Sequence, residues 1–92
     1  MAGSSDGALS AGELGRAALI TVQELTGYRP EAVTGLEWNG DLWTITVDAL
    51  EFERIPNTTD ILGEYEVQLD EHGTLRGYRR RRRFMRGQAR EE

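Results

Sequence analysis

The chain has 92 residues, the size of one small domain. It has no cysteine or lysine, and His72 is its only histidine, which excludes disulfides, thiolate chemistry and cysteine-ligated zinc. Acid–base or covalent chemistry would rest on carboxylates or an activated serine or threonine, because arginine stays protonated and makes a poor general base. No apolar run approaches the roughly 18 residues of a membrane span, and no signal peptide is recognised. Composition therefore predicts a cytoplasmic binding or assembly protein, not an enzyme.

The formal charge of −5 hides a strong asymmetry along the chain. Residues 1–75 carry 3 arginines against 14 acids, a balance of −11, whereas residues 76–92 carry 8 arginines against 2 acids, a balance of +6. An acidic body is therefore followed by a basic segment. Its arginines either pair with the acids of the body or face outward to bind an acidic partner. The sequence leaves both possibilities open.

Residues 10–26 are predicted to form a helix. Ser10 and Glu13 have the spacing of a capping box, and apolar residues then recur three and four positions apart. Gly27 is suited to end this helix. Residues 1–9 are small and polar without periodicity, which predicts a disordered N-terminal arm.

After Pro30 the apolar period becomes alternating, which predicts strands. The first two strands are expected on either side of Asn39-Gly40, the strongest short signal for a hairpin turn. One face of the second strand is apolar until Leu50, where the apolar residues switch to even positions. Such a switch indicates a bulge, a strong twist or a strand covered on both sides. The residues of that apolar face are Trp43, Ile45, Val47 and Ala49.

A second hairpin is expected around Gly73, between strands at 61–69 and at about 74–85. One helix on one face of a four-stranded antiparallel sheet, made of two hairpins, would bury the apolar surfaces of both. The predicted fold class is therefore α+β. Residues 10–86 are expected to form its single domain, and residues 87–92 are expected to form a flexible tail.

The register of the fourth strand decides where its arginines point. A three-residue loop places Leu69 opposite Leu75. Strict alternation beyond this point predicts two further cross-strand pairs. It would also place three arginines on the apolar face, and unpaired charges are not stable in a dry core. The register beyond Gly77 is therefore left open: either a bulge turns the arginines outward or the strand runs past the helix into solvent. The two further pairs are Glu66 with Tyr78 and Glu64 with Arg80.

The arginine run of the fourth strand is the candidate site. Guanidinium groups with interleaved aromatic rings can bind protein carboxylates or nucleic-acid phosphates, and such a run can also simply be solvated. The pI near 4.9 argues against nucleic acid, because the acidic body repels phosphate. We therefore expect an acidic protein surface as the partner. The residues expected to bind it are Tyr78, Arg79, Arg80, Arg81, Arg82, Arg83, Phe84 and Arg86.

No catalytic or metal site is predicted, and no cofactor is implied. Asp60 beside Glu53 and Glu64 could form an acidic metal site, but an Asn-Thr-Thr-Asp loop usually caps its own backbone. His72 is expected in solvent at a turn. Trp38 and Trp43 flank the Asn-Gly turn, and we expect them to pack as a cross-strand pair.

Several short motifs follow one another in a set order. Two early ones are Leu25-Thr26-Gly27-Tyr28-Arg29-Pro30-Glu31 and Trp43-Thr44-Ile45-Thr46-Val47. Later ones are Glu53-Arg54-Ile55-Pro56, Thr58-Thr59-Asp60-Ile61-Leu62 and Gly77-Tyr78-Arg79-Arg80. Taken together, over roughly residues 14–86, this ordered set resembles the gas vesicle protein GvpO family.

The resemblance implies a non-enzymatic accessory protein in the formation of gas vesicles, the gas-filled protein shells that some prokaryotes make in the cytoplasm. Its partners would be other gas vesicle proteins, and it would be cytoplasmic or associated with the vesicle. The alternative is a nucleic-acid-binding regulator of gas vesicle gene expression that uses the arginine run. A monomer or weak homo-oligomer is expected, because an exposed edge strand can pair with a second copy. We expect no membrane contact and no small-molecule substrate.

Overall fold

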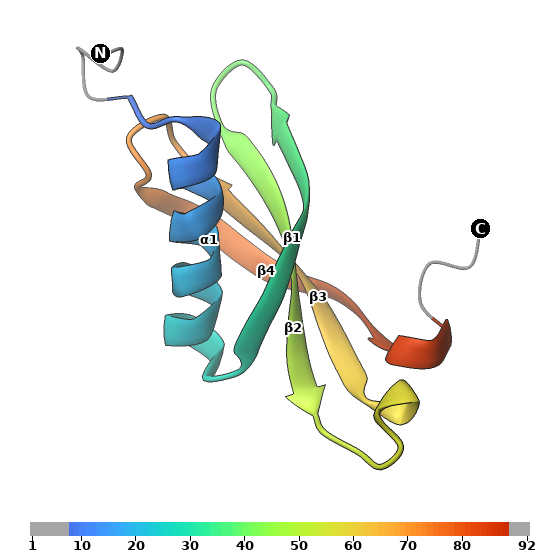
Figure 1. Ribbon diagram of the computed structural model, residues 1–92. Coiled ribbons are helices and arrows are strands. Elements are labelled where there is room, and N and C mark those ends of the chain that lie inside the picture. Colours follow the sequence, from blue (N-terminus) through green and yellow to red (C-terminus); the bar gives the residue numbers. More distant parts are fainter. Residues whose placement is uncertain (1–7, 89–92) are drawn as a thin grey trace.

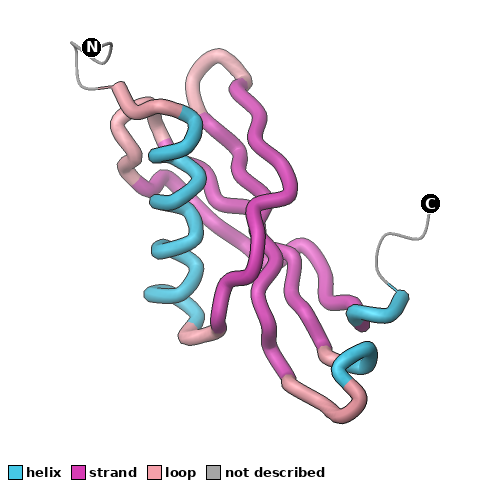
Figure 2. Tube along the Cα trace, viewed as in Figure 1, coloured by secondary structure: helices cyan, strands magenta, loops and turns pink. Residues whose placement is uncertain are grey.

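The computed structural model describes residues 8–88, and its elements follow the predicted order (Figure 1). One antiparallel sheet holds the strands in chain order, β1-β2-β3-β4. The one α-helix of the described residues packs on one face of this sheet, so the predicted α+β fold is confirmed (Figure 2). The elements are α1 (Ala11–Thr26), β1 (Arg29–Trp38), β2 (Trp43–Phe52), β3 (Ile61–Leu69) and β4 (Leu75–Met85), with 3-10 turns at Asn57–Thr59 and Arg86–Gln88.

The predicted capping box begins α1. The Glu13 N–H donates to Ser10 Oγ at 3.1 Å, and the Ser10 N–H donates to Glu13 Oε1 at 2.9 Å. At the other end, Gly27 adopts a left-handed φ of 79° and donates its N–H to the Gln23 carbonyl. Both ends of the helix are therefore fixed by the local signals that predict it.

The core lies between α1 and the sheet face that it covers, called here the inner face. Leu14, Ala18 and Val22 of α1 are fully buried against it. The predicted apolar face of β2 is part of this core. Its first residue, Trp43, packs against Trp38 as the predicted cross-strand pair, with 5.4 Å between the ring centroids. The sheet residues that are fully buried in the core are Ile45, Val47, Ala49, Val67 and Leu69.

The switch of apolar face in β2 is a bulge, one of the three predicted explanations. The pairing of β2 with β3 skips a residue between Leu50 and Phe52, and this extra residue is Glu51. The part of the sheet around this bulge extends beyond the end of α1 (Figure 1). The Glu51 carboxylate lies on the inner face in this part of the sheet and is therefore not covered by the helix.

Two bulges in β4 overturn part of the predicted register. Leu69 does lie opposite Leu75, as predicted, but Arg76 and Arg81 are then extra residues that oppose no single residue of β3. Each bulge shifts the following pairs by one residue. The predicted pairs of Glu66 with Tyr78 and of Glu64 with Arg80 are wrong: the observed pairs are Glu66 with Arg79 and Glu64 with Arg82.

The two ends of the described chain lie against the domain. The Leu9 N–H donates to the Glu71 carbonyl at 2.9 Å, and the Leu9 side chain packs against the core. At the other end, Arg86–Gln88 forms a 3-10 turn. Most of the predicted arm, residues 1–7, and residues 89–92 of the predicted tail lie outside the described residues.

Candidate functional site

The predicted site occupies β4, an edge strand of the sheet. We call residues 78–84 the arginine strand. The bulge at Arg81 resets the alternation in the middle of this strand, so its arginines divide between the two faces of the sheet. Arg80 and Arg83 lie on the inner face, opposite Tyr65 and Gly63. The other three arginines bind carboxylates of the opposite, outer face.

Two glutamates of β3 bind these outer arginines. Arg79 Nε lies 3.2 Å from Glu66 Oε1. Glu64 binds two guanidinium groups, because Arg81 Nη1 lies 3.0 Å from its Oε2 and Arg82 Nε lies 2.9 Å from its Oε1. Glu64 is only 8% exposed, although α1 packs on the other face of the sheet. Glu64 is flanked by Asp48 of β2 and Arg82 of β4 in the sheet, and two arginines cover its carboxylate.

On the inner face, the bulge residue Glu51 is the centre of a buried polar cluster. Its side chain has no exposed surface. Arg83 Nε lies 2.9 Å from Glu51 Oε1, and Arg80 Nη1 lies 3.3 Å from the same oxygen. The Tyr65 hydroxyl donates to Glu51 Oε2 at 2.7 Å. Burial and this hydrogen bond to an anion raise the pKa of Tyr65 well above its usual value, so the hydroxyl stays protonated.

Gly63 makes room for this cluster. A Cβ atom built on Gly63 would overlap the carboxylate of Glu51 and would lie 2.8 Å from Cε1 of Tyr65. The glycine is therefore required for close approach and not for its backbone angles. It lies directly opposite Arg83, so the carboxylate and the guanidinium meet above it.

A third group of ion pairs anchors the end of β4. Arg86 donates to both carboxylate oxygens of Glu31 at 3.0 and 2.9 Å, and its Nε lies 3.1 Å from Asp60 Oδ2. Asp60 also accepts the backbone N–H of Arg54 at 2.7 Å. This backbone hydrogen bond, followed by the contacts with Arg86, lowers the pKa of Asp60. The carboxylate of Glu31 raises the pKa of Arg86 further above its usual value.

These contacts answer the question of charge that the sequence leaves open. Each predicted site arginine has a carboxylate partner within the chain. Six guanidinium groups meet five carboxylates, so the basic segment is almost neutral where it lies on the body. The carboxylates are Glu31, Glu51, Asp60, Glu64 and Glu66.

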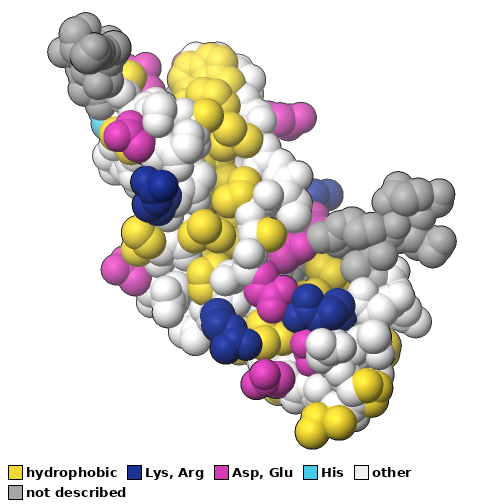
Figure 3. Space-filling view, in the orientation of Figure 1, with side chains coloured by type: hydrophobic (Ala, Val, Ile, Leu, Met, Phe, Trp, Pro, Cys, Tyr) yellow, Lys and Arg dark blue, Asp and Glu magenta, His cyan; other side chains and the backbone are white. Residues whose placement is uncertain are grey.

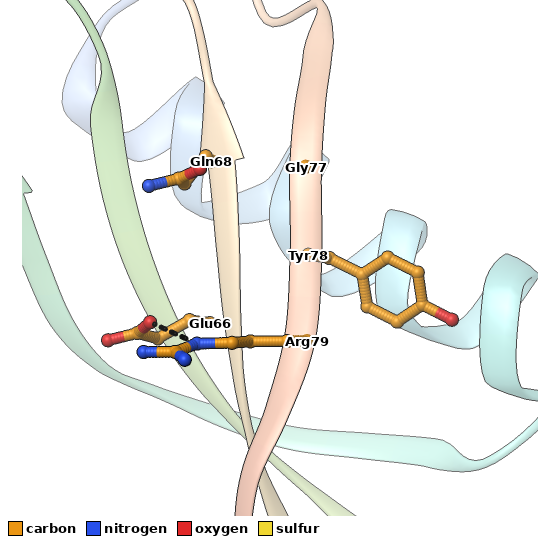
Figure 4. Close-up of a pocket in the computed structure, with 5 residues that line it drawn as sticks. All are labelled: Glu66, Gln68, Gly77, Tyr78 and Arg79. Carbon is orange, nitrogen blue, oxygen red and sulfur yellow. Dashed lines mark hydrogen bonds and ion pairs between the residues drawn. The ribbon is translucent and has the colours of Figure 1, made fainter.

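The two aromatic residues of the predicted site differ in their surroundings. Phe84 lies under the guanidinium of Arg82, which is 4.8 Å from the ring centroid. Tyr78 remains 42% exposed and points to the opposite side of β4 from Glu66 (Figure 4). A hollow of about 360 Å³ lies over the paired residues of β3 and β4. It is lined by Glu66, Gln68, Gly77, Tyr78 and Arg79.

The sequence did not reveal the carboxylates that organise this site. Glu51 reads as an ordinary surface glutamate, and the switch of face at Leu50 is the only local signal near it. Glu31 and Asp60 come from two other segments, so their contact with Arg86 depends on the whole fold. Two carboxylates considered for a metal site, Asp60 and Glu64, bind arginines instead. Within residues 8–88 no group of acidic or histidine side chains is arranged to hold a metal ion.

These features define a small α+β protein whose candidate site is an ion-paired arginine strand at a sheet edge. The chain matches the family described as gas vesicle synthesis protein GvpO over residues 2–90. It is 47% identical over 74 residues to gas vesicle protein O of Streptomyces sp. (strain CB03234), covering 80% of this chain and 58% of that protein. It therefore belongs to the gas vesicle protein O family, and the resemblance seen in its motifs is confirmed.

A second relative is gas vesicle protein O of Haloferax mediterranei, which is 39% identical over 71 residues, or 76% of this chain and 51% of that protein. The chain thus spans between half and two thirds of the length of these relatives. No solved structure matches it at a significant level. In the described part of the chain, no helix combines the length and apolarity needed to cross a membrane.

Proposed function

We propose that the protein is a non-enzymatic accessory protein in the formation of gas vesicles, acting in the cytoplasm through contacts with other gas vesicle proteins. Membership of the gas vesicle protein O family supports the process. The arrangement of the arginine strand supports the mode of action. Acidic surfaces of a shell or accessory protein are the proposed docking partners.

The observation that carries this proposal is that the guanidinium groups are fixed in place and still accessible. Arg79 retains 73% of its side-chain exposure while it binds Glu66. A guanidinium has five N–H donors, and the intramolecular carboxylates use one or two of them. The remaining donors can bind a second carboxylate. Because the side chains are already held, less conformational entropy is lost on docking.

The same pairing argues against the nucleic-acid alternative. Phosphate binding depends on uncompensated positive charge and the release of counterions. Here five carboxylates neutralise most of the charge of the arginine strand and Arg86. A protein partner that offers single carboxylates at fixed positions suits this surface better than a continuous phosphate backbone.

A pull-down of the full chain against each other product of a gas vesicle gene cluster tests the proposal. The test variant is the double substitution Arg79→Gln and Arg82→Gln. It leaves Glu64 bound to Arg81, so the fold retains a partner for that buried carboxylate. The matched control is Arg16→Gln, an exposed arginine of α1. Thermal unfolding of all variants shows whether they remain folded.

The pull-down is carried out at low and at moderate salt. We expect at least one gas vesicle protein to bind at low salt, and to bind more weakly at moderate salt. Its binding to the double variant should also be weaker. The Arg16→Gln control should bind like the original chain. Binding that is unchanged by the double substitution would contradict the proposed surface. If no protein binds at either salt concentration, and a gel shift with DNA or RNA of the gene cluster is seen, the nucleic-acid alternative replaces the proposal.

A further inference from the structure

The loop between β2 and β3 exposes a large apolar side chain completely. Ile55 is 99% exposed, whereas the other large apolar residues that reach the surface are half-buried. It lies three residues beyond the end of β2, at one extreme of the elongated molecule. Figure 3 shows hydrophobic side chains at this end. A single exposed apolar residue is common, so its surroundings decide whether it has a role.

The surroundings hold the loop in one conformation. On one side of Ile55, the Arg54 N–H donates to Asp60 at 2.7 Å. On the other side, the Pro56 carbonyl accepts from both the hydroxyl and the N–H of Thr59, at 2.7 and 3.0 Å. Asp60 is in turn bound to Arg86. Ile55 is thus presented from a fixed loop, which favours its use as an anchor because little entropy remains to be lost on binding.

The opposite end of the molecule carries an apolar pocket. Its volume is about 300 Å³, ample for one branched aliphatic side chain. It lies beside the start of β2, so the ten residues of that strand separate it from the loop of Ile55 by about 30 Å. Figure 3 shows hydrophobic side chains gathered at this end as well. The pocket is lined by Ala8, Leu9, Trp38, Trp43 and Glu71.

The charges of the two ends are complementary. Two acids lie at the pocket: Glu71 forms part of its wall, and the exposed Asp41 lies in the turn that joins Trp38 to Trp43. Next to Ile55 the exposed charge is Arg54, while the neighbouring Glu53 lies 3.9 Å from Arg29. An apolar side chain flanked by a cation therefore matches an apolar pocket flanked by anions.

We propose that the chain associates with a second copy of itself head to tail, with Ile55 of one molecule seated in the tryptophan-lined pocket of the next. The two complementary surfaces lie on different parts of the molecule, so the contact is heterologous and can continue from copy to copy. The contact is confined to one end of a molecule whose shorter dimensions are 28 and 23 Å. It is therefore smaller than a standard stable interface, and association is expected only at high concentration. This inference does not depend on the proposed partner contacts of the arginine strand.

Sedimentation velocity of the full chain between about 10 μM and 1 mM tests the proposal, since a weak contact has a dissociation constant within or near this range. We expect the mean mass to rise with concentration. Trp38 and Trp43 are the only two tryptophans of the chain, so their fluorescence should shift to shorter wavelength as the pocket is filled. A chain that stays monomeric with constant fluorescence at all concentrations overturns the proposal. The same result is expected if another segment of the same chain fills the pocket, so that case also overturns it.

Two variants identify the surfaces. Ile55→Gln removes the anchor and should weaken association by about tenfold or more, because an apolar side chain is no longer buried. The matched control is Ile20→Gln, a half-exposed isoleucine of α1, which should associate like the original chain. Trp38→Thr removes one wall of the pocket and should weaken association as well. Equal association of Ile55→Gln and the original chain overturns the proposal.

A mixing experiment distinguishes head-to-tail contact from a symmetric dimer. Ile55→Gln keeps an intact pocket, and Trp38→Thr keeps an intact anchor. Each variant alone should remain monomeric, whereas an equimolar mixture should form a 1:1 complex that does not grow further. A mixture that stays monomeric overturns the head-to-tail arrangement. Circular dichroism of each variant confirms that the loss of association does not come from unfolding.

Discussion

The Tyr65 hydroxyl donates a 2.7 Å hydrogen bond to the Glu51 carboxylate, whose side chain is completely buried. The carboxylate is reached from two strands, because Arg80 and Arg83 of β4 bind it from the other side. A buried anion requires such partners to offset the loss of hydration. Glu51 therefore links β2, β3 and β4 on the part of the inner face that extends beyond the helix.

We expect Glu51→Gln to destabilise the fold by about 2 kcal/mol. Removal of one member of a fully buried ion pair costs about 3–5 kcal/mol, but the two arginines are half-exposed and can be hydrated again. The measurement is urea unfolding. Glu53→Gln is the matched control, because its 3.9 Å contact with Arg29 is exposed, and it should change stability by less than about 0.5 kcal/mol. Similar effects of both substitutions would contradict the assigned role of Glu51.

Gly63→Ala should disturb the same cluster without removing a polar group. The added methyl group would occupy the space of the Glu51 carboxylate and approach the Tyr65 ring. We expect a loss of about 1–3 kcal/mol, typical of overpacking. Gly12→Ala is the opposite case, since nothing lies within 4 Å of the new methyl group in α1, and it should stabilise by about 0.5 kcal/mol. Thermal unfolding of the two variants measures both changes in stability. A Gly63→Ala protein as stable as the original chain would show that Gly63 is not closely packed against Glu51 and Tyr65.

The sequence predicts the elements of this fold well because their signals are local. The capping box of Ser10 and Glu13, the left-handed glycine at Gly27 and the alternation of β2 each act within a few residues. The register of β4 is different, since five consecutive arginines provide no alternation of apolar and polar residues from which to read a face. The arginines of β4 contact carboxylates that lie on other segments, and the order of residues within β4 does not reveal these contacts.

The candidate site shows the same limit. Its arginines are evident from composition, whereas their partners are not. Glu51 is buried only because Gly63 of another strand leaves space for it. Glu31 and Asp60 are 29 residues apart in the sequence and meet only at Arg86. Sequence reasoning can therefore identify the charged segment but cannot decide between internal pairing and free charge.

Acid should destabilise the protein through Asp60 and Asp70. The N–H groups of Arg54 and Thr74, respectively, are the largest cause of their lowered pKa values. A carboxyl group with a lowered pKa stabilises the fold above about pH 3.9, its value in the unfolded chain, and this contribution is lost as pH falls through the lower folded value. The melting temperature should therefore fall below about pH 4. In Asp60→Asn the melting temperature should fall less steeply with acid than in the original chain. If the two profiles of melting temperature against pH are parallel, Asp60 does not contribute to the loss of stability in acid.

Arg86→Lys tests whether the geometry of the guanidinium matters in addition to its charge. Arg86 binds both oxygens of Glu31 and also Asp60, which joins β1, the loop before β3 and the end of β4. A lysine keeps the charge but offers one compact ammonium group, which cannot reproduce this forked contact. We expect a loss of about 1 kcal/mol in urea unfolding. Arg76 makes a 3.6 Å ion pair with Asp70 at the surface, and Arg76→Lys should be neutral within about 0.5 kcal/mol. Equal stability of the two lysine variants would mean that charge alone explains the role of Arg86.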